Sequence, residues 1–160
     1  MKTKRIIYTI IIILWIAVIF GFSLQPAAMS NDISGSVLMR ILVPIFPQIM
    51  ESKELVDFAH LFVRKAAHFT EYMVLGMLSV NAIKYYLTKK LYVISAGFCV
   101  VIAMIDETIQ LFVPGRDGRL WDVLIDSSGA IAGIVLWMLF IHFVKKNHMK
   151  FPNSEKNIKK

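Results

Sequence analysis

Charged residues and cysteines are scarce in this chain. Asp, Glu, Lys and Arg make up 18% of its 160 residues, whereas about a quarter is usual in a soluble domain. The single cysteine, Cys99, lies in an apolar run, so a disulfide scaffold is excluded. The sequence also has no serine nucleophile elbow and no glycine-rich phosphate loop, which leaves those two chemistries without support.

Apolar residues, in contrast, are in excess, at 57% of the chain with a mean hydropathy of +0.63. A soluble domain of this length buries only about 70% of its extended-chain surface, which would leave many of these side chains in water. A bilayer removes that difficulty, and the apolar content also excludes a disordered chain. The net charge of +7 does not indicate nucleic acid, because the basic residues flank apolar runs instead of forming a stripe with aromatics. We therefore expect a membrane protein with no nucleic-acid partner.

Four segments are long and apolar enough to cross a bilayer, which takes about 20 residues of helix. They cover residues 6–24, 66–87, 91–113 and 120–144. The first predicts an uncleaved anchor, because its apolar run exceeds the core of a signal peptide and no small-x-small cleavage pattern follows. The second is the least apolar, but its polar residues fall near its ends, where they can reach the interface. The predicted fold is all-α, a polytopic membrane bundle of four transmembrane helices.

The stretch between the first two spans predicts an interfacial helical segment. It contains two apolar helical faces, and we expect helix caps at Ser30 or Asn31 and at Ser52. The first face consists of Ile33, Val37, Leu38 and Ile41, and the second of Leu55, Phe58 and Phe62. Packing on the bundle and contact with lipid both fit these faces.

Basic residues predict the orientation. With the N-terminus inside, the inner segments hold 12 of the 18 Lys and Arg residues and the outer segments hold six. This bias favours two cytoplasmic termini, in agreement with an even number of spans. Residues 1–146 are then the integral membrane domain, and residues 147–160 form a polybasic cytoplasmic tail.

The polar residues of the last three predicted spans converge at the outer end of the bundle, because successive spans run in opposite directions. Gly129 and Gly133 form a G-x-x-x-G pair that predicts close approach of another helix just below. The predicted catalytic residues are His68, Glu71, Asp106, Glu107 and Asp122. The predicted substrate-binding residues are Arg64, Lys65, Tyr72, Gln110, Arg116 and Asp126.

These residue types suit proton transfer and anion binding. A histidine shuttles protons at neutral pH, a carboxylate serves as general base, and arginine grips phosphate or carboxylate. A histidine with several carboxylates also binds divalent ions, but no compact motif such as H-E-x-x-H is present, so no metal ligand is predicted, and the cofactor stays unknown. The alternative is a structural ion-pair cluster that only holds the helices together.

The same residues resemble the VanZ-like family of small bacterial membrane proteins. The matching stretches cover residues 22–26, 64–72, 75–76, 106–107 with Gln110, 114–116, 122–124 and Gly129, in family order. Asp126 departs from the pattern, because the family commonly has asparagine there. The resemblance implies a multi-pass protein of the bacterial cytoplasmic membrane, with a founding relative linked to low-level resistance to the lipid-tailed glycopeptide teicoplanin.

Three functions stay open on the sequence. The outer polar site could act on an envelope lipid as an enzyme, or bind a lipid-linked wall precursor or lipid-tailed antibiotic without catalysis. A purely structural scaffold is the third, and a homo-oligomer could line a pathway. The sequence alone leaves enzymatic activity undecided.

Overall fold

Helices joined by turns and short loops make up residues 2–150, the part that the computed structural model describes, and there is no strand among these residues. The predicted all-α class is therefore confirmed. Four long helices dominate the structure, and shorter elements join the first two of them. The long helices are α1 (Lys2–Ser23), α4 (Lys53–Ile83), α5 (Leu91–Gln110) and α6 (Leu120–Lys150).

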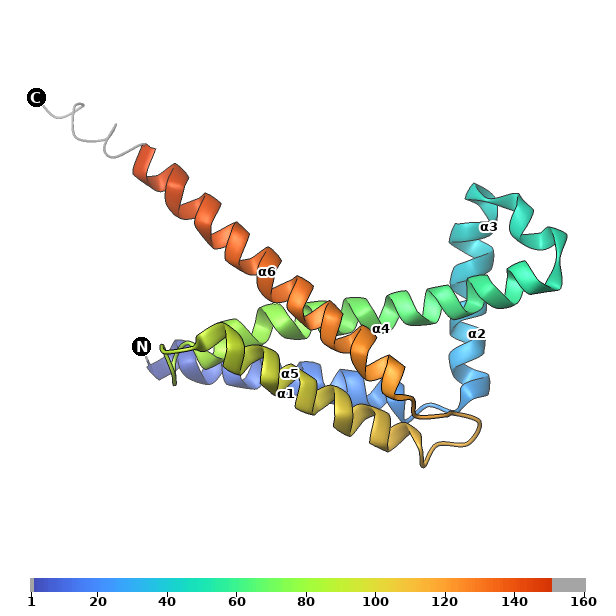
Figure 1. Cartoon of the computed structure of the whole chain (residues 1–160), viewed down its shortest axis with the longest axis horizontal. Coiled ribbons are helices and arrows are strands. Elements are labelled where there is room, and N and C mark those ends of the chain that lie inside the picture. Colours follow the sequence, from blue (N-terminus) through green and yellow to red (C-terminus); the bar gives the residue numbers. More distant parts are fainter. Residues whose placement is uncertain (1, 151–160) are drawn as a thin grey trace, which may run out of the picture.

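The long helices alternate in direction. Helices α1 and α5 run one way, whereas α4 and α6 return, and α6 leaves the bundle over its last turns (Figure 1). The ends of α1 and α5 and the start of α6 therefore lie together at what we term the polar end of the bundle. This agrees with the alternation expected from the sequence.

Three of the four predicted spans are long and apolar enough to cross a membrane: α1, α5 and residues 120–146 of α6. Helix α4 does not qualify, which corrects the expectation of four clear spans. The reason is its composition, since polar and charged side chains recur along it, and part of it lies inside the bundle. Tyr72 and Leu75 of α4 are fully buried in the core with Ile19 of α1 and Cys99 of α5.

Glycines set the contact between α4 and α6. A Cβ at Gly129 would lie 3.1 Å from the Cα of Phe69, and a Cβ at Gly133 would lie 3.0 Å from the Cα of Met73. A side chain at either position would meet the backbone of α4, so the predicted close approach at this pair is confirmed. Gly76 of α4 faces the backbone of Ala130 in the same way.

The segment between α1 and α4 forms a helical hairpin that lies across α4 (Figure 1). It consists of α2 (Ala27–Val37), a π-helical turn (Leu38–Leu42), α3 (Val43–Ile45) and a 3-10 turn (Pro47–Glu51). Ser34 of α2 contacts His60 of α4, with 3.2 Å between Oγ and Nδ1.

Several predicted boundaries shift. The cap expected at Ser30 or Asn31 is wrong, because α2 begins at Ala27 directly after Pro26. The cap at Ser52 is confirmed, since its hydroxyl accepts a hydrogen bond from the Leu55 amide. Helix α4 then continues to Ile83, so the second amphipathic face and the second predicted span form one helix.

The predicted polybasic tail begins within the last turn of α6. Helix α6 extends to Lys150, so the backbone of residues 147–150 is helical. The rest of the predicted polybasic tail, residues 151–160, lies outside the described residues.

Candidate functional site

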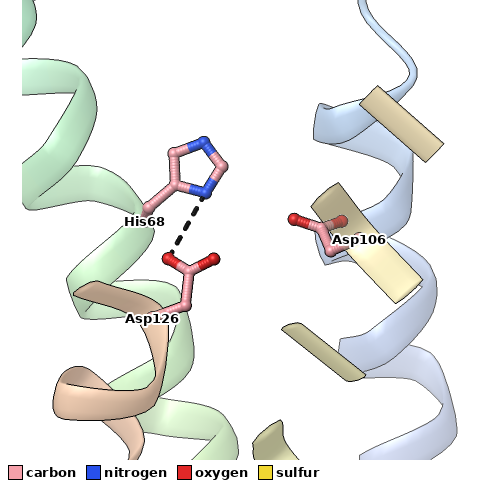
Figure 2. Close-up of side chains that lie close together, drawn as sticks. All are labelled: His68, Asp106 and Asp126. Carbon is pink, nitrogen blue, oxygen red and sulfur yellow. Dashed lines mark ion pairs between the residues drawn. The ribbon is translucent and has the colours of Figure 1, made fainter. Parts of the chain in front are cut away.

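Three helices bring a histidine and two aspartates together at the polar end. Figure 2 shows His68 of α4 and Asp126 of α6 side by side, with Asp106 of α5 facing them. The Nδ1 atom of His68 lies 3.7 Å from Oδ1 of Asp126. One ligand-type atom from each of the three residues lies within 4.8 Å of the other two. We refer to His68, Asp106 and Asp126 as the buried cluster.

The cluster is closed off from solvent and poor in hydrogen bonds. Asp106 and Asp126 are 0% exposed, and the His68 side chain is 15% exposed. Oδ1 of Asp106 and both carboxylate oxygens of Asp126 have no hydrogen-bond partner. Buried carboxylates without partners are costly, so such groups in a native fold call for an explanation.

Two hydroxyl groups complete the surroundings of Asp106. Ser23 and Tyr72 are almost fully buried and lie near the Asp106 carboxylate, but neither makes a hydrogen bond of standard geometry. Sequence reasoning proposed Tyr72 and missed Ser23. The signal for Ser23 was its place as a hydroxyl at the end of α1, level with the acidic residues.

Glu107 and Gln110, by contrast, form a satisfied network. Oε1 of Glu107 accepts a hydrogen bond from Nε2 of Gln110 at 2.9 Å, and Oε2 accepts one from the Arg119 amide at 2.8 Å. Gln110 also donates to Oδ2 of Asp106 at 3.4 Å. Both Glu107 oxygens are thus occupied in holding the loop before α6 against the end of α5.

Arg116 ties that loop to the end of α1. Its Nε donates to the carbonyl of Gln25 at 3.0 Å, and Nη2 donates to the carbonyl of Phe22 at 3.1 Å. Its Nη1 donates to Oε1 of Gln110 at 3.3 Å. Burial and the charge of Arg64 lower the pKa of Arg116 from its ordinary value. This anchoring to α1 carbonyls was not foreseen from the sequence, which contains no pattern linking residues this far apart.

Lys65 and Asp122 form an ion pair at the margin of the site. Their side chains are 26% and 13% exposed, and the pair joins α4 to α6 one turn before the buried cluster. This pair agrees with the alternative in which charged residues form ion pairs that only hold the helices together.

A pocket of about 200 Å³ opens beside the buried cluster, between α2, α4 and the end of α1. Its polar lining comes from Arg64, His68, Glu71 and Arg116, and its apolar lining includes Ile33, Val37 and Val63. An apolar groove adjoins it and shares Val37, Val63, Ala67 and Glu71. Trp15, Ile41, Leu42 and Phe62 line the rest of the groove together with Ala66, Thr70 and Val74. We refer to the two as the pocket and the groove.

All eleven predicted site residues lie at the polar end, but the structure divides them by surroundings. His68, Asp106, Asp126 and Tyr72 are in or beside the buried cluster, while Glu107, Gln110 and Arg116 belong to the network that fastens the loop. Arg64 and Glu71 line the pocket, and Lys65 pairs with Asp122.

Comparison with known proteins gives one result. The family model described as VanZ/LLP1 matches residues 8–141, which include most of α1, all of α2 to α5 and most of α6. No curated protein and no solved structure matches the chain.

Proposed function

Because the chain belongs to the VanZ/LLP1 family and is a membrane protein, we propose that it binds the headgroup of an envelope lipid or lipid-linked wall precursor. The observation that carries this proposal is the pocket with its adjoining groove. The pocket is lined by two arginines, a histidine and a glutamate, and the groove is almost wholly apolar. A ligand with a charged head and a hydrocarbon tail matches that pairing.

The arginines supply the anion-binding part. A guanidinium has five N–H donors, and Arg116 uses three of them on protein acceptors, which leaves two. Arg64 lines the same pocket. Arginine suits phosphate and carboxylate groups because its planar donors bind two oxygens at once. A phospholipid and a polyprenyl phosphate carry a phosphate next to a hydrocarbon chain, and the lipid-tailed glycopeptide teicoplanin also has a hydrocarbon tail.

We place the site at the outer leaflet of the bacterial cytoplasmic membrane, with both termini cytoplasmic. The support is the distribution of Lys and Arg, 12 on the inner side against six on the outer. In this arrangement α4 is the fourth span. Its central ionisable residues Arg64, His68 and Glu71 line the pocket, and ionisable groups inside membranes usually face such polar surroundings rather than hydrocarbon.

Catalysis is a second step of the proposal. Glu71 and His68 line the pocket together, so a bound headgroup would lie within reach of a general base and a proton carrier. The rival function, a scaffold held by ion pairs, accounts for Lys65 and Asp122. It does not account for a pocket lined by Arg64, His68 and Glu71.

Native mass spectrometry of the detergent-purified protein tests lipid binding. The probes are phosphatidylglycerol, undecaprenyl phosphate and, as a control without phosphate, diacylglycerol. We expect retention of an anionic probe, loss of it in Arg64→Ala, and weakening in Ala67→Leu, which narrows the junction between pocket and groove. Lys89→Ala, at the opposite end of the bundle, is the matched control.

Equal retention of all three lipids, or no effect of Arg64→Ala, would refute the proposed site. A change in the mass of a retained lipid over time, abolished by Glu71→Gln, would identify the protein as an enzyme. Retention without such a change would make it a binding protein.

A further inference from the structure

We propose that the buried cluster of His68, Asp106 and Asp126 binds a divalent first-row transition metal ion. The inference goes beyond the proposed lipid function and does not depend on it. It also departs from the expectation drawn from the sequence, which considered compact motifs only. Here the three residues come from three helices and are far apart in the sequence, so no short motif contains them (Figure 2).

The spacing fits a metal site. Ions of this class bind nitrogen and oxygen ligands at about 2.0–2.2 Å, which puts neighbouring ligands roughly 3.4 Å apart in a tetrahedral arrangement. The Nδ1 atom of His68 and Oδ1 of Asp126 are 3.7 Å apart, too far for a hydrogen bond and close to that value. All three ligand atoms lie within 4.8 Å of one another.

Charge gives the second reason. Among the residues whose side chains the structure describes, neither Asp106 nor Asp126 forms an ion pair with lysine or arginine. Lys65 pairs with Asp122, and Arg116 is bound to carbonyl groups and Gln110. With a metal ion bound, both aspartates would be ionised and the imidazole neutral, so one divalent cation would cancel the charge of its ligands. Three carboxylate oxygens of this pair have no partner, and a cation would use them.

An independent observation points the same way. The hydroxyls of Tyr72 and Ser23 are 0% and 1% exposed, lie near Asp106, and make no hydrogen bond of standard geometry. Metal ligands are commonly oriented by hydrogen bonds from a surrounding set of polar groups. Two buried hydroxyls beside one carboxylate suit that role, whereas a cluster that held helices together by itself would use them in complete hydrogen bonds.

The ligand types indicate which ions would bind. Calcium and magnesium prefer shells of oxygen, whereas an imidazole beside carboxylates favours Zn²⁺, Fe²⁺ or Mn²⁺. Three protein ligands leave a coordination position open, as in catalytic rather than structural zinc sites. His68 also lines the pocket, so the ion would lie next to the place proposed for a headgroup.

Metal analysis of the full-length protein tests the inference without added lipid. The purified protein is stripped with EDTA, incubated with Zn²⁺ or Mn²⁺ separately, passed through a desalting column and assayed for bound metal. We expect about one ion per chain for at least one of the two. No retained stoichiometric metal in either case overturns the inference, whatever the outcome of the lipid experiment.

Variants then locate the ion by titration calorimetry. Asp126→Asn and Asp106→Asn keep the side-chain shape but remove a ligand charge. Each should weaken binding by more than the ~10- to 100-fold that loss of a supporting hydrogen bond costs. His60→Ala and Asp117→Asn control for an imidazole and a carboxylate elsewhere. Unchanged affinity in both cluster variants, with the same helical circular dichroism as wild type, would place the ion outside the cluster.

Discussion

Replacing Gly133 with leucine tests the helix contact that brings His68 to Asp126. A Cβ at this position would lie 2.8 Å from the carbonyl carbon of Met73, and backbone atoms in a helix cannot rotate away as a side chain can. Overpacking of this kind costs about 1–3 kcal/mol, offset by up to about 1 kcal/mol because leucine favours helix over glycine. We expect a net loss of roughly 1 kcal/mol in the free energy of unfolding.

Gly97→Leu is the matched control. Gly97 lies on α5, and a Cβ there would have no atom within 4 Å. The same gain in helix propensity then acts alone, about 1 kcal/mol in favour of the folded state. Unfolding of both variants in mixed detergent micelles, followed by far-ultraviolet circular dichroism, gives the difference. If Gly133→Leu is as stable as Gly97→Leu, α4 and α6 do not meet at this glycine, and the geometry of the buried cluster loses its support.

Three further predictions concern the loop before α6. Arg116→Lys should destabilise the protein nearly as much as Arg116→Ala, by about 2 kcal/mol in thermal unfolding, because an ammonium cannot reach the same fork of acceptors; full rescue by lysine would show that charge alone matters. Glu107→Gln should lower the free energy of unfolding by about 1–3 kcal/mol in the same assay. In the wild type each carboxylate oxygen accepts a hydrogen bond, one from Gln110 and one from the Arg119 amide, and the NH2 group of glutamine would face one of these donors. An unchanged melting temperature would mean that this network is dispensable. Asp117→Cys in a Cys99→Ser background should react with a membrane-impermeant thiol reagent on intact cells if the loop is outside, and labelling only after lysis would reverse the proposed orientation. Asp117 is chosen because its side chain is 78% exposed, whereas a Cβ at Gly118 would lie 2.9 Å from Cγ of Leu111.

The sequence by itself determined the helical class and three of the long helices. Each of α1, α5 and α6 contains an uninterrupted apolar run. Such a run predicts a membrane-spanning helix whichever other helices pack against it. The close helix contact at the glycine pair of α6 was also predictable, because residues four apart share one helix face. Alternation of direction then sufficed to bring the polar residues to one end.

Helix α4 shows where this reading failed. Its start at Lys53 and its single course to Ile83 combine a polar, amphipathic stretch with a more apolar one. Local composition placed a boundary between them. Whether polar residues in a long helix meet water, lipid or other helices depends on its neighbours, and α1, α5 and α6 all pack against this one.

Only the tertiary structure separated residues of the same type by role. Asp106 and Glu107 are adjacent in sequence, yet Glu107 has both oxygens hydrogen-bonded and Asp106 has one without a partner. Successive residues of a helix point about 100° apart, so one faces the loop backbone and the other faces His68 and Asp126. The sequence identified the acids, but hydrogen bonds and metal ligation depend on distances of a few ångströms between helices, and those distances exist only once the helices have packed.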